Sequence, residues 1–105
     1  MAFCLAVFRS RTQVMEFVEY MQSRGIDSRA VNTPAEAHVG CGISARFPQF
    51  YLNYAKEVVQ KLMLTSFAGF YVVSVNGGRT RVRRVKTRSE RLITVKQQKF
   101  IPITS

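Results

Sequence analysis

Residues 2–8 read Ala2-Phe3-Cys4-Leu5-Ala6-Val7-Phe8, an apolar run without one charged or amide side chain. A strand with one face in water alternates polar and apolar residues, whereas a strand covered on both faces is apolar throughout. The run therefore predicts a central strand of a sheet. Within it, Cys4 is expected to behave as a small, inert hydrophobic residue.

A helix is predicted directly after this strand. Ser10 and Gln13 have the S-x-x-Q spacing of a capping box, whose two side chains satisfy backbone N–H groups at a helix start. The apolar residues that follow recur at the i, i+3, i+4 and i+7 positions of one helical face: Val14, Phe17, Val18 and Met21. Gly25 is expected to end the helix, with Ile26 folding back onto its last turn.

Further segments complete the predicted fold. Short strands are expected at residues 28–32 and 43–47, and a longer aromatic and β-branched strand at residues 67–75. Pro48 suits the first turn of a second helix, whose apolar stripe runs to Leu62. The triplet at residues 76–78, Asn-Gly-Gly, is a hairpin turn signal, and basic residues alternate with Val or Thr after it.

This order of elements predicts an α+β fold, a ferredoxin-like βαββαβ sandwich with a basic C-terminal β-hairpin or tail extension. We expect one domain at residues 1–78 and the extension at residues 79–105. The first two strands should run parallel, and the right-handed rule for crossover connections fixes their arrangement. The loop after the second strand then lies where the first strand ends, and Thr65 and Ser66 are expected at the same end.

Cys41 lies in that loop between Gly40 and Gly42. Neighbours without side chains leave a thiol open to approach, and successive amides around it can form an anion-binding nest. A helix N-terminus and positive side chains also stabilise a thiolate, which is the nucleophilic form of cysteine. We predict Cys41 as the chemically active residue, with its anion stabilised by Gly40, Gly42, Arg9, Ser10 and Arg46.

His38 is the only histidine in the chain and precedes Cys41 in the same loop. It is a candidate for a local base, although a solvated loop residue is the simpler interpretation. A structural zinc site needs four ligands, so we predict neither a metal nor a cofactor. Cys4 is expected about 13 Å from Cys41, too far for a disulfide.

The charge of the chain is unevenly distributed. Residues 1–78 hold seven Lys and Arg against five Asp and Glu, whereas residues 79–105 hold nine against one. Such a block favours polyanions through counterion release, and it also suits a solvated tail or a protected edge strand. The alternative hypothesis is a nucleic-acid-binding module that uses residues 79–99 and the sheet aromatics Phe70 and Tyr71. Its basic contacts are predicted to be Arg79, Arg81, Arg83, Arg84, Lys86 and Arg88.

Four of these segments together resemble a known family. They are Phe8-Arg9-Ser10, Gly25-Ile26, Thr33-Pro34 and the run from Cys41 to Phe47, Cys-Gly-Ile-Ser-Ala-Arg-Phe. The combination is similar to the small bacterial selenium/sulfur carrier protein-like family, over roughly residues 3–75. The resemblance implies that Cys41 accepts and donates sulfur or selenium as a persulfide or selenopersulfide, without turnover of its own. Ala35 and His38 depart from the family pattern, which affects anion affinity or thiol activation in the loop.

Partners and location can also be predicted. The resemblance implies sulfur or selenium donor and acceptor proteins, and the basic segment suits an acidic protein or nucleic acid. An apolar first strand needs cover on both faces of its sheet, which the tail or a second copy in a homodimer would supply. Two cysteines are too few for a disulfide scaffold, and no run approaches the length of a membrane span. We expect a cytoplasmic protein without membrane contact.

Overall fold

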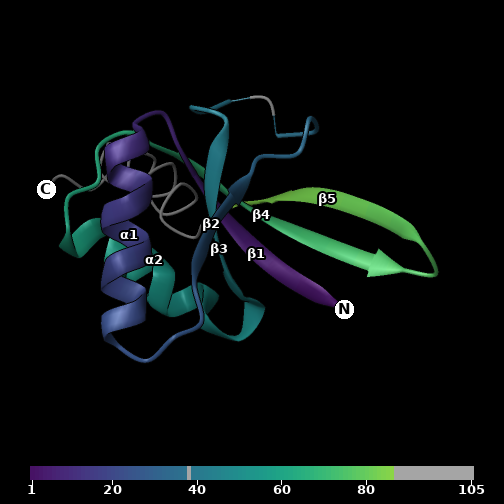
Figure 1. The fold of residues 1–105 in the computed structure, drawn as a ribbon, viewed down its shortest axis with the longest axis horizontal. Coiled ribbons are helices and arrows are strands. Elements are labelled where there is room, and N and C mark those ends of the chain that lie inside the picture. Colours follow the sequence, from purple (N-terminus) through teal and green to yellow (C-terminus); the bar gives the residue numbers. More distant parts are fainter. Residues whose placement is uncertain (38, 87–105) are drawn as a thin grey trace, which may run out of the picture.

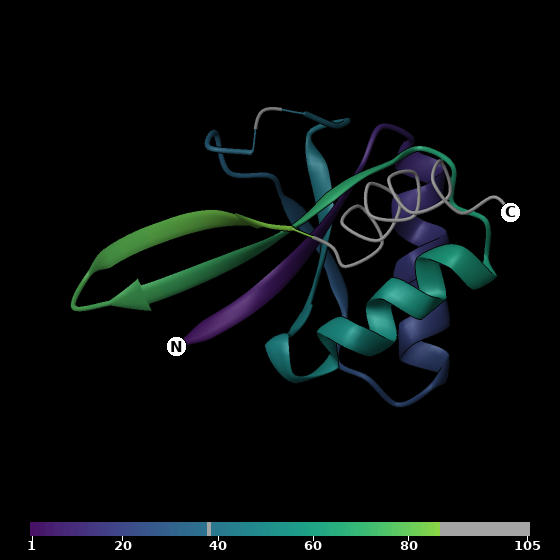
Figure 2. The same ribbon diagram turned by 180° about the vertical axis from the view of Figure 1, so that it is seen from behind.

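The computed structural model describes residues 1–37 and 39–86. These residues form an α+β fold in which a five-stranded antiparallel sheet carries two α-helices on one face (Figure 1; Figure 2 gives the view from behind). The elements are β1 (Ala2–Phe8), α1 (Arg11–Ser23), β2 (Arg29–Asn32), β3 (Ile43–Pro48), the short 3₁₀ helix η1 (Gln49–Tyr51), α2 (Leu52–Lys61), β4 (Phe67–Asn76) and β5 (Arg79–Val85). The predicted α+β class is confirmed.

β1 is the central strand of the sheet, whose order is β2-β3-β1-β4-β5. Cys4 is paired with Phe47 of β3 on one side and with Val72 of β4 on the other. β1 and β2 are both antiparallel to β3 and therefore run in the same direction, as predicted. Residues 4–8 are all buried, which explains why this strand has no polar side chain.

Alternate residues of β1 contribute to two different cores, because successive side chains of a strand point to opposite faces. Cys4, Ala6 and Phe8 join the main core beneath the helices, while Leu5 and Val7 join a smaller cluster on the other face. The fully buried rings of the main core are Phe8, Phe17, Phe47 and Phe70. Their neighbouring centroids lie 5.7 to 6.0 Å apart. Burying each ring contributes about 1.5–3 kcal/mol relative to leaving it exposed.

The N-terminus of α1 is capped by Ser10, but not through a complete capping box. Ser10 Oγ accepts a hydrogen bond from the Gln13 amide at 3.2 Å, as predicted. The Gln13 side chain, however, does not return to the Ser10 amide. That amide donates to Ser66 Oγ at 3.1 Å, and Ser66 Oγ donates to Gln13 Oε1 at 2.7 Å. Ser66, at the entry to β4, therefore ties the helix start to the sheet.

The C-terminus of α1 ends as the sequence predicts. Gly25 adopts a left-handed conformation with φ +78°, and its amide donates to the Gln22 carbonyl at 2.9 Å. The Ile26 amide donates to the Met21 carbonyl at 3.1 Å, and both side chains are buried. This pair of bonds is a Schellman motif, with its usual apolar contact across the helix end.

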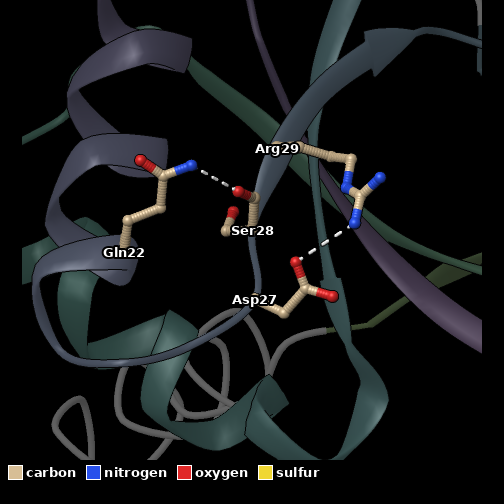
Figure 3. A network of polar contacts seen from close by, with 4 residues as sticks. All are labelled: Gln22, Asp27, Ser28 and Arg29. Carbon is tan, nitrogen blue, oxygen red and sulfur yellow. Dashed lines mark hydrogen bonds and ion pairs between the residues drawn. The ribbon is translucent and has the colours of Figure 1, made fainter.

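A short polar network then leads the chain from α1 into β2 (Figure 3). Gln22 Nε2 donates to the Ser28 carbonyl at 2.8 Å, and Asp27 pairs with Arg29 at 3.3 Å. The Ser28 hydroxyl is buried and has no hydrogen-bond partner within the described residues. β2 is thereby fixed against the last turn of α1 before it joins the sheet.

The start of α2 differs from the prediction. Pro48 does not begin a helix: it has ψ 140° and is paired with Phe3 at the end of β3. The φ of proline is compatible with both extended and helical backbone, and the pairing with β1 selects the extended form. η1 follows, and α2 begins at Leu52.

The predicted hairpin joins β4 to β5. Gly77 and Gly78 have φ +55° and +81°, the two positive values that a type I′ turn requires. β5 pairs with β4 from Arg79 opposite Asn76 to Val85 opposite Phe70, so the sheet continues past the turn. The remainder of the predicted extension, residues 87–105, lies outside the described residues.

Candidate functional site around Cys41

The loop from Thr33 to Gly42 brings Cys41 to the end of β1. The Cys41 amide donates a hydrogen bond to the Phe8 carbonyl at 3.1 Å. On the other side of the same segment, the Arg9 amide donates to the Ser66 carbonyl at 2.9 Å. The end of β1 is therefore held between Cys41 and Ser66, just before the first turn of α1. This is the end of the sheet at which the crossover argument placed both residues.

Gly40 makes the close approach of this loop to β1 possible. Its φ is +108°, and a Cβ at this position would lie 2.7 Å from Val7 Cγ1 and 2.9 Å from the Phe8 carbonyl oxygen. Gly42 also has a positive φ, +97°, but a Cβ there would meet nothing within 4 Å. Gly42 thus serves the backbone conformation alone, whereas Gly40 also provides the space that seats Cys41 against β1.

Polar contacts close the two ends of the loop. The Thr33 amide donates to the Gly42 carbonyl at 2.9 Å, and the hydroxyl oxygens of Thr33 and Ser44 lie 2.5 Å apart. Ser44 is fully buried, so this contact satisfies a hydroxyl that would otherwise be buried without a partner. A cavity of about 300 Å³ opens on the loop, and the described residues that line it are Thr33, Pro34, Ala35, Ala37, Val39, Gly40 and Gly42.

The Cys41 thiol is half-buried and packs against the edge of the main core. Its Sγ lies 3.7 Å from the Ile43 carbonyl oxygen, a weak S–H···O contact. The core that Cys41 packs against is the main one beneath the helices. The site therefore presents a partly accessible sulfur atom whose backbone is fixed on both sides.

Cys4, the second free cysteine, has the opposite environment. Its side chain is fully buried in β1. Burial raises the pKa of the Cys4 thiol from 9.0 to about 11, an effect that the positive charge of Arg83 only partly offsets. Cys4 is thus protonated at neutral pH and shielded from solvent, in agreement with an inert residue.

Comparison with known proteins identifies the family. The family described as "Putative Se/S carrier protein-like" matches residues 3–71. The chain belongs to this family. The match begins in β1, includes the whole Cys41 loop and ends in β4, and it confirms the resemblance seen in the sequence. No curated protein and no solved structure matches the chain significantly.

The structure brings some of the predicted site residues of this Se/S carrier family member together and separates others. Gly40, Gly42, Arg9 and Ser10 lie with Cys41 at the end of β1. Arg46 does not: its guanidinium carbon lies 3.9 Å above the Phe3 ring, and it is paired with Leu5. It follows Cys41 by five positions in the sequence, and it faces away from the helices because its partner Leu5 belongs to the cluster on the opposite face. The predicted base, His38, lies outside the described residues.

The residues predicted to bind nucleic acid differ in their exposure: the aromatic rings are buried, and the basic side chains that the structure describes are exposed. Phe70 belongs to the main core, and Tyr71 is only 9% exposed, so neither ring is open to stack a base. The basic residues before Thr87 lie on or just after the edge strand β5 and are exposed: Arg79, Arg81, Arg83, Arg84 and Lys86. Arg88 lies outside the described residues.

The groups missed by sequence reasoning are mostly backbone atoms. The Phe8 and Ile43 carbonyl groups hold Cys41 at its amide and near its thiol, and no residue type marks such a carbonyl in advance. The Thr33–Ser44 contact did leave a signal, since a serine within an apolar strand has to find a partner. Within residues 1–37 and 39–86, no three His, Cys, Asp or Glu residues gather closely enough to hold a metal ion. Over the same residues, no helix is long and apolar enough to span a membrane.

Proposed function

We propose that this protein carries sulfur or selenium on Cys41, as a persulfide or a selenopersulfide. The observation that supports this proposal is the contrast between the two thiols. Cys41 is partly accessible at a fixed rim of the sheet, while Cys4 is buried and has its pKa raised to about 11. Membership of the Se/S carrier family supports the identity of the cargo and implies donor and acceptor proteins as partners.

The proposed transfer needs no oxidant or reductant. The Cys41 thiolate attacks the outer sulfur of a donor persulfide, the S–S bond of the donor breaks, and the donor leaves as a thiolate. A new S–S bond joins Cys41 to the transferred sulfur, which keeps its hydrogen. An acceptor thiolate then attacks the same outer atom and regenerates the Cys41 thiolate. Selenium in the outer position follows the same exchange.

The site contributes position and charge to these steps. The bond from the Cys41 amide to Phe8 and the space at Gly40 fix the loop, so that the sulfur lies at the same end of the sheet as Arg9 and the start of α1. A positive side chain and a helix N-terminus each favour an anion in general, which is the contribution we propose for them here. The S–H contact with the Ile43 carbonyl belongs to the neutral thiol, because a thiolate has no proton to donate.

We infer that the part of the fold that carries this site is ferredoxin-like. The strand order β2-β3-β1-β4 and the two helices on one face support that inference. β5, the first part of the proposed extension at residues 79–105, adds a fifth strand at the edge of the sheet.

The carrier function can be tested by loading and release. The full chain is incubated with glutathione persulfide, and its mass is measured before and after excess of an acceptor thiol. The wild-type chain and Cys4→Ala should each gain one sulfur atom and lose it to the acceptor, whereas Cys41→Ser should gain none. Loading of Cys41→Ser at the wild-type rate would contradict the proposal, as would a modification of Cys41 that acceptor thiols do not remove.

A further inference from the structure

The edge strand β5 carries a row of exposed arginines at alternate positions. β5 is the last strand in the order β2-β3-β1-β4-β5, and β4 is its partner on the inner side. Arg79, Arg81 and Arg83 are all exposed. Because successive side chains of a strand point to opposite faces, these three lie on one face, about 7 Å apart. They form the arginine row.

The arginine row lies on the face of the sheet that carries the helices, but beyond them. Arg83 is paired with Val72, which belongs to the main core, and paired residues point to the same face. Arg84 is paired with Tyr71 of the other cluster, so it is not part of the row. The β4–β5 hairpin extends past both helices, and neither helix covers its outer part (Figure 1).

No acidic side chain of the described strands lies beside the arginine row. None of the five strands contains Asp or Glu. The partners of the row on β4 are uncharged: Asn76, Ser74 and Val72. The ion pair between Asp27 and Arg29 lies at the opposite edge of the sheet, next to β2. The row therefore presents three positive charges along a single strand.

An edge strand can add another strand, and the charge of β5 selects which one. The outward N–H and C=O groups of an edge strand are a template for pairing with another chain. A second copy of this protein, paired through a two-fold axis, would bring its own arginines opposite these, and like charges in that position are unfavourable. A strand with carboxylates at alternate positions would instead place one beside each arginine. A guanidinium binds a carboxylate through two parallel hydrogen bonds.

We propose that β5 binds an extended acidic segment of another protein by strand addition, with carboxylates at alternate positions beside Arg79, Arg81 and Arg83. The seven residues of β5 span about 24 Å, which accommodates a segment of similar length. The other edge strand, β2, has four residues and one arginine, which is already paired with Asp27. The length and charge therefore favour β5 as the docking edge.

The surroundings of the arginine row favour a peptide over a single-stranded nucleic acid. Sites for single strands combine basic residues with aromatic rings on which bases stack. None of the residues paired with the row is aromatic, and Phe50, whose side chain is 87% exposed, belongs to η1 rather than to the sheet. A peptide strand also uses the outward main-chain groups of β5. The proposal does not depend on sulfur transfer, because it involves neither thiol.

Fluorescence anisotropy of the full chain with two labelled peptides tests the proposal. One peptide, of about eight residues, alternates Glu with Thr, and in the other Pro replaces each Thr. The two carry the same charge, but proline has no N–H to donate to an edge strand. The Glu-Thr peptide should bind at least about tenfold more tightly, which corresponds to the loss of one or more backbone hydrogen bonds.

Variants of the arginine row test the contribution of charge. Arg81→Gln combined with Arg83→Gln should weaken binding of the Glu-Thr peptide by about tenfold, since each cross-strand charge pair is worth up to about fivefold. The matched control is Arg24→Gln combined with Lys61→Gln, which removes the same charge from exposed positions at the end of α1 and in α2. It should weaken binding by less than about threefold, because salt screens distant charges.

Amide hydrogen exchange, followed by mass spectrometry, locates the contact. Exchange of residues 79–85 should slow when the Glu-Thr peptide binds, because the outward N–H groups of β5 acquire acceptors. Unchanged exchange in β5, or no detectable binding of the Glu-Thr peptide, would overturn the proposal. Equal affinity of the two peptides or equal losses in the two double variants would do the same. Tighter binding of a labelled RNA of about ten nucleotides would assign the arginine row to nucleic acid instead.

Discussion

Replacing Gly40 by alanine tests how Cys41 is held in place. At φ +108° the new Cβ would lie 2.7 Å from Val7 Cγ1 and 2.9 Å from the Phe8 carbonyl oxygen. The Phe8 carbonyl also accepts the Cys41 amide at 3.1 Å, so relief of the overlap must move the loop and weaken that bond. Gly42→Ala is the matched control, because its φ is +97° and its Cβ would meet nothing within 4 Å.

The expected magnitudes differ between these two variants. A Cβ at positive φ costs about 1–2 kcal/mol, of which about 0.4–1 kcal/mol is offset because alanine restricts the unfolded chain. This leaves about 1 kcal/mol for Gly42→Ala. Overlap with packed neighbours adds about 1–3 kcal/mol at Gly40 alone. Gly40→Ala should therefore lower the free energy of unfolding by about 2–4 kcal/mol.

Urea unfolding of the wild type and both variants measures these free energies. Persulfide loading of the folded variants, with glutathione persulfide as donor, then reports on the position of Cys41. Gly40→Ala should lose both stability and loading rate, and Gly42→Ala should retain most of each. Equal losses of stability in the two variants, or loading of Gly40→Ala as fast as the wild type, would show that Gly40 does not seat Cys41 against β1.

Three further predictions concern residues around the site. The wild type should lose stability relative to Cys4→Ala as the pH rises from 9 to about 11, because the thiol ionises there in the unfolded chain while the buried thiol stays protonated. Urea titrations at several pH values measure this difference, and a constant difference over the range would contradict the raised pKa. Ser66→Ala should cost about 1–3 kcal/mol by leaving the Ser10 amide without its acceptor. Thermal unfolding would show this against Ser23→Ala, whose exposed hydroxyl donates to the Tyr20 carbonyl and should contribute less than about 0.5 kcal/mol to stability. Ser28→Ala should leave the free energy of unfolding unchanged or raise it by up to about 1 kcal/mol, since the buried hydroxyl has no partner within the described residues. A clear loss of stability would show that the hydroxyl is hydrogen-bonded.

Local patterns predicted the features that depend on neighbouring residues. The apolar run of β1, the Ser10 cap, the Gly25–Ile26 helix end and the Gly77–Gly78 turn are each encoded within a few positions. Topology then placed Cys41 beside the end of β1, because the handedness of crossovers allows one arrangement.

Features that depend on contacts between distant residues could not be predicted from local sequence patterns. Ser66 enters the Ser10–Gln13 cap from more than fifty positions away, and Arg46 stacks on Phe3 rather than approaching Cys41. Sequence spacing cannot assign Phe70 to the helix side of the sheet, because β4 is apolar on both faces and shows no alternation. The φ of Pro48 suits both a helix start and an extended strand, and its pairing with β1 selects the extended form.

The proposed carrier function requires a fold that leaves Cys41 open to sulfur transfer and shields Cys4. Treating the full chain with a persulfide donor, once folded and once in urea, and mapping the added sulfur by peptide mass spectrometry distinguishes the two thiols. Cys41 alone should be modified in the folded chain, while Cys4 and Cys41 should be modified at similar rates in urea. Equal modification of both cysteines in the folded chain, or none at Cys41, would contradict the proposed function.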